Sequence, residues 1–470
     1  MLSAGSRRWR RWLLALAVLI VVVIAGVVAF VLLHKPGNVT NSGVPFTAPI
    51  TTATPPPPIN KKKKAKPPTF LWPLYGYNDT RTRSFTGQSN LRPPFHVGWR
   101  FGGNALIEFP PVIEGHVMYF IDDGATAKAV NTITGKQIWL THLGTLSAAS
   151  PAIARRQRLI VVPLLADHGS SPGGGRVAAL SMRTGHVVWS RNVPSGTESS
   201  PLVSGHSVYL GDQAGTVYGL NVTNGRIEWT FQASAAVKGG LALSGGLLYF
   251  GDYAGRVYAI RGLNGHRVWS ASTSGSQFGF GSGNFYSTPA VAFGRVYLGN
   301  TDGFVYSFAA GNGQLGWSHS TGAYVYASAS VADVPGLGPT VYVGSYNGEF
   351  YALNARSGAV RWAHPSGGRI SGSSTIINNI VYYSVLGSRR TIGLNATTGR
   401  VEYSFSDGAF TPMIADRGHL YLSGYDKIYQ LIPSGSPHPR PAVHRARHKT
   451  RRPVRHHRRH IRNKRHHRKR

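Results

Sequence analysis

The stretch VYLGDQAGTVYGLNVTNGRIEW at 208–229 decides the fold, because VYVGSYNGEFYALNARSGAVRW at 341–362 repeats its plan. Each copy predicts a strand rich in Val and Tyr, a Gly hairpin, a strand ending near Leu-Asn, a turn ending in Gly, and a strand closing on Trp. Seven such phrases follow one another, with closing residues 40 to 50 positions apart. About four strands in a repeat near forty residues are typical of a β-propeller blade. The closing aromatic residues are Trp139, Trp189, Trp229, Trp269, Trp317, Trp362 and Tyr403.

An eighth phrase is divided between the two ends of the series. Trp99 lies 40 residues before Trp139, in register with the repeat, but no set of strands precedes it. At the other end, residues 411–432 supply three strands and no closing strand. We therefore expect residues 95–101 to form the outer strand of the last blade, which leaves no open edge between first and last blade. The predicted fold is all-β, an eight-bladed propeller over 94–435 with four strands per blade.

The repeated aromatics and glycines have structural interpretations. One Trp per blade, at the same place in the outer strand, suits packing between blades better than a cofactor platform. The Gly that precedes each outer strand lies in a hairpin turn that requires a positive φ, which glycine adopts at little cost. These glycines are Gly135, Gly185, Gly225, Gly265, Gly313, Gly358 and Gly399.

Composition excludes several kinds of chemistry. The chain has 470 residues and no Cys, so disulfides, thiolate metal sites, thiol nucleophiles and lipidated cysteines are impossible. Its net charge of +34 belongs to the ends, because no Asp or Glu occurs before Asp79 or after Asp426. The propeller itself is therefore far less basic than the whole chain.

The N-terminal segments predict a membrane-anchored protein. Residues 13–33, LLALAVLIVVVIAGVVAFVLL, are an unbroken apolar run of about the length that crosses a bilayer. Four Arg before it favour a cytoplasmic N-terminus and an extracytoplasmic propeller, hence a single-pass plasma-membrane protein. We expect a cytoplasmic basic N-terminus at 1–11, a transmembrane signal anchor at 12–34, and a Pro/Lys-rich linker with the lead-in to the propeller at 35–93.

The C-terminal residues 436–470 predict a disordered basic tail. HRARHKTRRPVRHHRRHIRNKRHHRKR at 444–470 has almost no apolar residues and repels itself. Such a tail favours adhesion to a polyanion, and outside the cell that means wall polymer, acidic glycan or lipid head groups rather than nucleic acid. Its His pairs have no Cys or carboxylate partners, so we expect no defined metal site.

Chain direction places one set of candidate binding residues on a single face. Loops that lead into the inner strands share this top face with the loops between second and third strands. Aromatic residues there suggest a grip on a sugar ring or a peptide, or else a cover over the channel mouth. Charged residues there suggest a polar ring around the axis, or else separate solvated and salt-bridged groups. The candidates are Glu198, Lys238, Phe278, Phe280, Phe285, Tyr286, Tyr324, Tyr326, Arg369 and Asp407.

The repeats resemble the pyrroloquinoline-quinone-type propeller family, most clearly in ALNARSGAVRW at 352–362 and GLNATTGRVEY at 393–403. WPLYGYNDTRTR at 72–83 is similar to the segment that leads into bacterial membrane-anchored members. The family contains quinoprotein dehydrogenases and also non-enzymatic binders, such as the propeller lipoprotein of the outer-membrane barrel-assembly machinery. The enzymes add an adjacent Cys pair and a calcium-binding Glu/Asn set, and the first is impossible here.

The resemblance and the residues together favour a monomeric, non-catalytic binding or scaffold module of the cell envelope. Its expected partners are the membrane, an envelope protein or glycan at the top face, and an anionic polymer or lipid at the tail. No cofactor is expected. The alternative is a dehydrogenase that uses pyrroloquinoline quinone.

Overall fold

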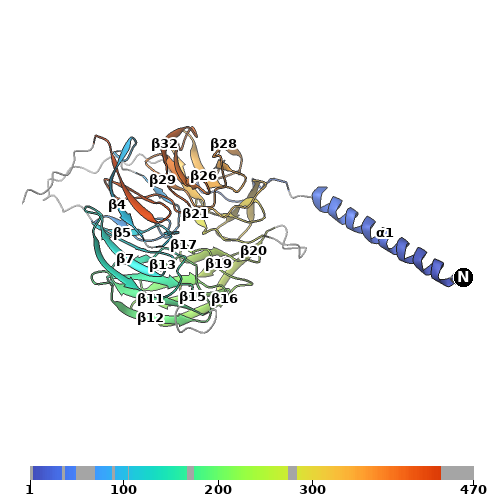
Figure 1. Cartoon of the computed structure of the whole chain (residues 1–470), viewed down its shortest axis with the longest axis horizontal. Helices are drawn as coiled ribbons and strands as arrows, with labels where there is room; N and C mark the ends of the chain where they lie inside the picture. The colour runs from blue at the N-terminus through green and yellow to red at the C-terminus, as the bar shows by residue number, and fades with distance from the viewer. Residues whose placement is uncertain are drawn as a thin grey trace, which may run out of the picture. The chain divides into compact units, whose positions relative to one another are not determined.

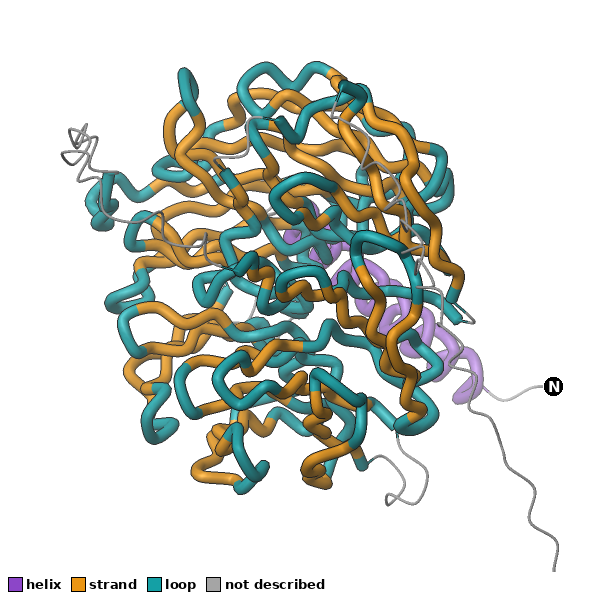
Figure 2. The backbone as a smooth tube through the Cα atoms, turned by 90° about the vertical axis from the view of Figure 1, so that its left-hand side faces the viewer, coloured by secondary structure: helices purple, strands orange, loops and turns teal. Residues whose placement is uncertain are grey.

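The computed structural model describes residues 4–33, 37–48, 69–86, 90–103, 105–166, 174–273 and 283–435. The strands of the repeats form eight sheets, one per blade, and the inner strands of neighbouring blades contact one another. Figure 1 shows the sheets following one another around a centre, and Figure 2 shows strands joined by short loops. The predicted all-β, eight-bladed propeller is confirmed.

Every blade is an antiparallel meander that runs from an inner to an outer strand. Blades 1 to 4 consist of β5 (Val112–Glu114), β6 (Val117–Ile121), β7 (Thr126–Asn131) and β8 (Gln137–His142); β9 (Ala152–Ala154), β10 (Leu159–Leu164), β11 (Gly175–Ser181) and β12 (Val187–Val193); β13 (Leu202–Ser204), β14 (Ser207–Gly211), β15 (Thr216–Asn221) and β16 (Ile227–Gln232); β17 (Ala242–Ser244), β18 (Leu247–Gly251), β19 (Arg256–Arg261) and β20 (Arg267–Ser272).

Blades 5 to 8 repeat this plan. They consist of β21 (Ala290–Ala292), β22 (Arg295–Gly299), β23 (Phe304–Ala309) and β24 (Leu315–Ser320); β25 (Ser330–Val334), β26 (Gly338–Gly344), β27 (Glu349–Asn354) and β28 (Val360–Pro365); β29 (Thr375–Ile377), β30 (Ile380–Val385), β31 (Arg390–Asn395) and β32 (Val401–Phe405); β33 (Ile414–Ala415), β34 (Leu420–Ser423), β35 (Lys427–Pro433) and β4 (Phe95–Gly102).

The ring closes as the sequence predicts. β4 pairs antiparallel with β35, and Phe101 lies opposite Ile428 while Trp99 lies opposite Gln430. The outer strand of blade 8 therefore comes from upstream of blade 1. The pairing connects the two ends of the repeat series by backbone hydrogen bonds and leaves no open sheet edge between them.

The hydrophobic core lies between blades. One cluster, for example, joins Val161 and Ala179 of blade 2 to Val208 and Leu210 of blade 3, and all four side chains are buried. A blade alone would expose one of its faces, so the free energy from apolar burial depends on its neighbours.

The closing tryptophans connect each blade to the next, as packing between blades requires. The turn glycine of the next blade lies against the indole ring: a Cβ on Gly135 would come within 2.8 Å of Trp99, and its φ is 68°. Glycine is thus required there by backbone conformation and by close approach. Tyr403 differs, because its ring packs edge-on against Phe95 at 5.3 Å. The indole Nε1 donors and their carbonyl acceptors are Trp99 to Thr132, Trp139 to Met182, Trp189 to Val222, Trp229 to Gly262, Trp269 to Ala310, Trp317 to Ala355 and Trp362 to Ala396.

Three short strands before β4 extend blades in a way that the repeat does not predict. β1 (Val39–Thr40) pairs with the outer strand β24. β2 (Leu71–Trp72) pairs with the inner strand β5, and β3 (Ser84–Phe85) runs parallel to the inner strand β29. The propeller therefore includes strands upstream of its predicted start near residue 94.

Residues 69–86, which we call the axial segment, run past the inner strands on the axis. The backbone carbonyls of Pro73, Asp79, Thr80, Thr82 and Arg83 accept hydrogen bonds from N–H groups in blades 2, 4, 5, 6 and 7 respectively. Residues expected to form a lead-in thus replace water as the partner of these inner-strand donors.

The helix α1 (Ala4–Leu33) covers the run predicted to span a membrane. Among the helices in the described part of the chain, none is long and apolar enough to cross a membrane. The predicted transmembrane helix is therefore not supported. The compact unit that contains the propeller ends at Ser434, and the predicted tail at 436–470 lies outside the described residues.

A candidate binding site on the propeller axis

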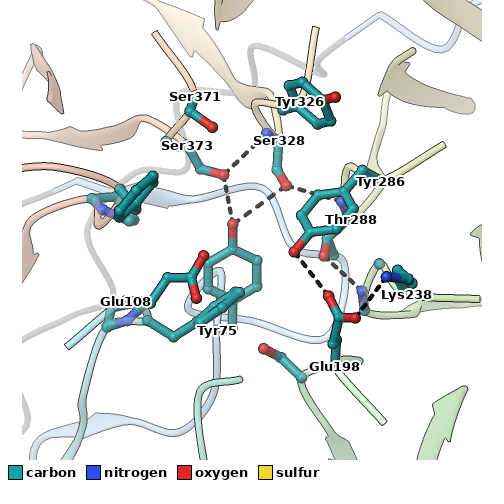
Figure 3. A pocket seen from close by; sticks show the side chains of 18 residues that line it. Tyr75, Glu108, Glu198, Lys238, Tyr286, Thr288, Tyr326, Ser328, Ser371 and Ser373 are labelled. Atoms are coloured by element: carbon teal, nitrogen blue, oxygen red, sulfur yellow. Dashed lines mark hydrogen bonds and ion pairs between the residues drawn. The ribbon is translucent and has the colours of Figure 1, made fainter. Parts of the chain in front are cut away.

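A partly open cavity of about 60 Å³ lies on the axis where loops lead into the inner strands. We call it the axial funnel. Figure 3 shows side chains from these loops pointing toward a common space above Tyr75. The lining residues are Tyr75, Glu108, Phe109, Pro110, Glu198, Ser200, Lys238, Gly239, Gly240, Tyr286, Thr288, Tyr326, Ser328, Ser371, Gly372, Ser373, Phe410 and Pro412.

The floor of the funnel is the axial segment. The Tyr75 hydroxyl lies 2.5 Å from Ser373 Oγ and donates to Ser328 Oγ at 3.3 Å. The Arg83 guanidinium lies 4.8 Å from the centre of the Tyr75 ring. Burial alone would raise the pKa of Tyr75, but the charge of Arg83 and the two serine hydroxyls lower that pKa below its ordinary value. Tyr75 is thus a fixed polar group at the base of the site.

Below Tyr75, Arg81 fills the axis. Its side chain is completely buried, and Nε donates to Leu241 O at 2.8 Å while Nη2 donates to Ser200 O and Pro201 O at 3.0 Å each. Nη1 donates to Tyr75 O. Burial and the charge of Arg83 lower the pKa of Arg81 to about 9. Arg81 therefore connects the axial segment to blades 3 and 4.

Hydroxyl groups hold the funnel wall together from blade to blade. Gly240 N donates to Thr288 Oγ1 at 2.8 Å, Thr288 N donates to Ser328 Oγ at 2.9 Å, and Ser328 N donates to Ser373 Oγ at 3.0 Å. The same contact thus recurs across blades 4, 5, 6 and 7. A site on such a wall is preorganised, because its side chains already have fixed partners.

Glu198 is held by three donors in the funnel wall. Lys238 Nζ lies 2.7 Å from Oε1, Gln213 Nε2 donates to Oε1 at 2.6 Å, and the Tyr286 hydroxyl donates to Oε2 at 3.1 Å. Burial and the negative charges of Glu198 and Glu108 raise the pKa of Tyr286 above its ordinary value. Tyr286 therefore stays neutral and acts as a hydrogen-bond donor.

Glu108 is the exception among the charged groups of the funnel. Its carboxylate is partly buried and has no hydrogen-bond or ion-pair partner among the described residues, and Figure 3 shows it beside Tyr75. Burial, with the charges of Asp123 and Glu198, raises the pKa of Glu108 to about 7. Burial and the charge of Asp122 raise the pKa of Asp123 to about 6. The funnel thus holds one carboxylate whose charge has no counter-ion.

A chain of tyrosine rings leads away from the funnel over blades 4 to 6. Ring centres lie 6.3 Å apart for Tyr253 and Tyr286, 5.8 Å for Tyr286 and Tyr326, and 5.0 Å for Tyr326 and Tyr346. Tyr324 continues the cluster 5.8 Å from Tyr326 and is half exposed. Aromatic rings with polar tips in a row suit a ligand that is apolar along its length and polar at its edge.

The predicted top-face residues divide into those that meet in the funnel and those that do not. Glu198, Lys238, Tyr286 and Tyr326 line it, which gives the predicted polar ring a partial counterpart. Tyr324 lies beside it in the tyrosine cluster.

The remaining predicted residues lie elsewhere. Arg369 is exposed, 5.8 Å from the ring of Tyr346. Phe285 is fully buried in the core between blades 4 and 5, so its prediction as a binding residue is wrong. Asp407 accepts a hydrogen bond from Tyr429 at 2.8 Å and does not line the funnel. Phe278 and Phe280 lie outside the described residues.

Sequence reasoning missed Tyr75 and Glu108. Tyr75 belongs to a segment outside the repeat, so no periodic pattern marks it. Glu108 lies four residues before the first residue of the inner strand of blade 1, and Glu198 lies four residues before that of blade 3; this shared position is a signal that could have identified Glu108.

We predict that Glu108→Gln flattens part of the pH dependence of stability. A carboxyl whose pKa rises from 4.5 unfolded to about 7 folded favours the folded state at low pH, and this contribution is lost as pH rises from about 4.5 to about 7. The variant should therefore gain about 2 kcal/mol relative to wild type between pH 5 and pH 8 in urea unfolding. The exposed Glu228→Gln is the matched control. An equal difference from wild type at both pH values would contradict the assignment.

Comparison with protein families matches residues 123–297 and 279–434 to the family described as outer membrane protein assembly factor BamB, of the PQQ-repeat type. The chain belongs to this family. The BamB family match covers most of the ring; the strands β4, β5 and β6 lie upstream of it.

Among solved structures, BamB from Moraxella catarrhalis aligns with a TM-score of 0.58 at 18% identity, over 74% of this chain and all of that one. Quinohemoprotein alcohol dehydrogenase ADHIIG from Pseudomonas putida HK5 aligns with a TM-score of 0.64 at 14% identity, over 79% of this chain and 82% of that one. At these identities the likeness concerns the fold. Tetrathionate hydrolase from Acidithiobacillus ferrooxidans is 26% identical over 101 residues, so the match spans about a fifth of each chain.

The quinone and calcium ion that the dehydrogenase branch implies do not fit the residues on this axis. The described residues contain no group of three or more His, Asp or Glu side chains that could hold a metal ion. Of the two funnel carboxylates, Glu198 already binds Lys238, and a calcium ion prefers six to eight oxygen ligands. The space below Tyr75 belongs to Arg81 and Arg83.

Proposed function

We propose that this chain is a non-catalytic binding propeller of the bacterial cell envelope and that it holds its ligand or partner at the axial funnel. One observation carries the proposal. Tyr75 of the axial segment lies at the base of the funnel, and loops of several blades supply aromatic and polar walls with fixed hydrogen-bond partners. Membership of the BamB family supports an envelope role with protein partners.

Blocking the funnel tests this proposal. Ser371 lines the funnel wall, and Ser371→Trp should lower the recovery of a cross-linked envelope component at least tenfold, because the indole occupies the site. Val188→Trp, on the exposed edge of blade 2, is the matched control and should leave recovery unchanged. Equal recovery with both variants would show that the funnel is not the site.

The alternative, a quinone-dependent dehydrogenase, is supported by the fold likeness to quinohemoprotein alcohol dehydrogenases. Our proposal expects no saturable tryptophan fluorescence quenching when pyrroloquinoline quinone and Ca²⁺ are added, and no dye reduction with alcohols or sugars. Saturable quenching together with dye reduction above the protein-free rate would replace the binding role by an enzymatic one.

We also propose that α1 attaches the propeller to the plasma membrane with its N-terminus in the cytoplasm. The apolar sequence of 13–33 and the exposed side chains of 12–26 support this, whereas the described helix alone does not qualify as a span. Alkaline carbonate extraction of membranes tests whether the chain is attached. An attached chain stays in the membrane pellet, and an unattached chain is released into the supernatant. Protease digestion of intact cells then reports which side the propeller occupies.

We predict that deletion of 436–470 reduces retention of the chain on isolated cell walls at low salt. Each Lys or Arg near an anionic surface contributes roughly 1 kcal/mol, and salt screens this attraction. Retention of the full chain should therefore fall as NaCl rises, and retention of the truncated chain should be low throughout. Retention that is independent of salt and of the deletion would remove the role of the tail.

A further inference from the structure

The axial funnel contains a carboxylate, that of Glu108, for which the described residues supply no partner. Lys238 is paired with Glu198 at 2.7 Å, and Gln213 and Tyr286 complete the donors around that carboxylate. No cation among the described residues is paired with Glu108. Below the floor, Arg81 and Arg83 donate to backbone carbonyls, and Arg83 also to Tyr75. Lys238 therefore satisfies one of two carboxylates in the funnel.

The groups around Glu108 favour a positively charged ligand over other kinds. An anion would add to the negative charges of Glu108, Glu198 and the nearby Asp123 in a partly desolvated site. A neutral sugar would desolvate Glu108 further without supplying a counter-charge, which is costly. A protonated amine supplies both the charge and N–H donors.

The funnel wall adds a second, independent reason. Aromatic rings surround the space in which Glu108 lies, and two of them, Tyr75 and Phe109, have centres 6.1 Å apart. The ring of Tyr286 is a third, and that of Tyr326 lies 5.8 Å from it. Aromatic faces attract cations through their quadrupole, and a cation between a carboxylate and such faces gains from both.

We propose that the axial funnel binds its ligand through a protonated amine, held at the Glu108 carboxylate against the aromatic wall formed by Tyr75, Phe109 and Tyr286. This inference rests on the proposed function and names the ligand chemistry of the same site. The amine has two possible sources, a free polyamine or a lysine side chain of a peptide, and the recognised group is the same in both.

The pH dependence of binding follows from the groups that face Glu108. These are Tyr75, Asp123, Glu198 with its partner Lys238, and Tyr286. A protonated amine pairs with the ionised form of Glu108. Because the pKa of Glu108 is about 7, its carboxyl group must lose a proton before the amine can bind at pH 6. Binding should therefore be about tenfold weaker at pH 6 than at pH 8.

Isothermal titration of the full chain in detergent tests the inference, with spermidine in one arm and a blocked Gly-Lys-Gly peptide in the other. We expect saturable binding in at least one arm, and the arm that binds identifies the source of the amine. Glu108→Gln should weaken binding at least tenfold and abolish its pH dependence, whereas Glu228→Gln should change neither. Glu108→Asp keeps the charge and should retain part of the affinity if Glu108→Gln fails to fold.

A third arm with a neutral chito-oligosaccharide separates this inference from the proposed function. One outcome is that the sugar binds, that Ser371→Trp abolishes this binding, and that neither amine binds. It would overturn the inference of an amine ligand and leave the funnel as the binding site. Amine binding that is unchanged in Glu108→Gln would also overturn the inference. If no ligand binds in any arm, and Ser371→Trp and Val188→Trp recover equal amounts of the cross-linked envelope component, both the amine inference and the proposed function would be contradicted.

Discussion

Arg81→Ala should lower the free energy of unfolding by about 3–5 kcal/mol, because it removes the donors of four hydrogen bonds on the axis. Leu241, Ser200, Pro201 and Tyr75 would each keep a backbone carbonyl with no protein donor, in a space that the truncated side chain leaves empty. The lost hydrogen bonds involve blades 3 and 4 and also the floor of the funnel. Urea unfolding followed by tryptophan fluorescence measures it.

Two variants set the scale for this prediction. Arg92→Ala removes an exposed arginine in the segment before β4 and should change stability by less than about 0.5 kcal/mol. Arg81→Lys keeps the charge but has one ammonium group in place of a planar guanidinium, so it should recover only part of the loss. If Arg81→Ala were as stable as Arg92→Ala, the axial segment would not hold the inner strands together.

Lys128→Ala should cost about 3–5 kcal/mol for a different reason. Lys128 and Asp122 form a salt bridge in blade 1, and the two side chains are 3% and 2% exposed. Removing the lysine leaves a buried carboxylate that still accepts a hydrogen bond from the N–H of Thr126 but has lost its counter-ion. Breaking a buried pair at one end is strongly destabilising, although the intact pair itself adds little.

The repeat supplies a matched rescue for this pair. Blades 3 and 4 have tyrosine at the equivalent position, and the hydroxyls of Tyr218 and Tyr258 donate to Asp212 and Asp252 at 2.8 Å each. Lys128→Tyr should therefore stay within about 1.5 kcal/mol of wild type. Thermal unfolding of both variants reports the difference, and equal losses for Lys128→Ala and Lys128→Tyr would show that Asp122 does not need a donor there.

Much of this architecture could be predicted because the repeat has local physical causes. The turn glycine has a positive φ and contacts a tryptophan of the preceding blade, so both residues recur at fixed spacing. The position of Trp99, one repeat before Trp139, was enough to predict that β4 pairs with β35. Glu198 and Lys238 reach the funnel because chain direction fixes which loops face the axis.

The axial segment could not be predicted in the same way. Residues 69–86 have no periodic pattern, and the charged side chains of Arg81 and Arg83 argue against burial from sequence alone. Their partners are carbonyls of distant blades, and no local sequence signal records these contacts. Tyr75 was missed for this reason, and with it the floor of the funnel.

The most direct test of the account places a photo-crosslinking amino acid at Tyr326 in the funnel wall and, in a second variant, at Val188 on the outer edge of blade 2. After irradiation of intact cells, mass spectrometry of the recovered chain detects adducts of any size. We expect a discrete adduct at position 326 that Ser371→Trp abolishes, and none at position 188. Adducts at position 188 alone would contradict a binding site on the axis.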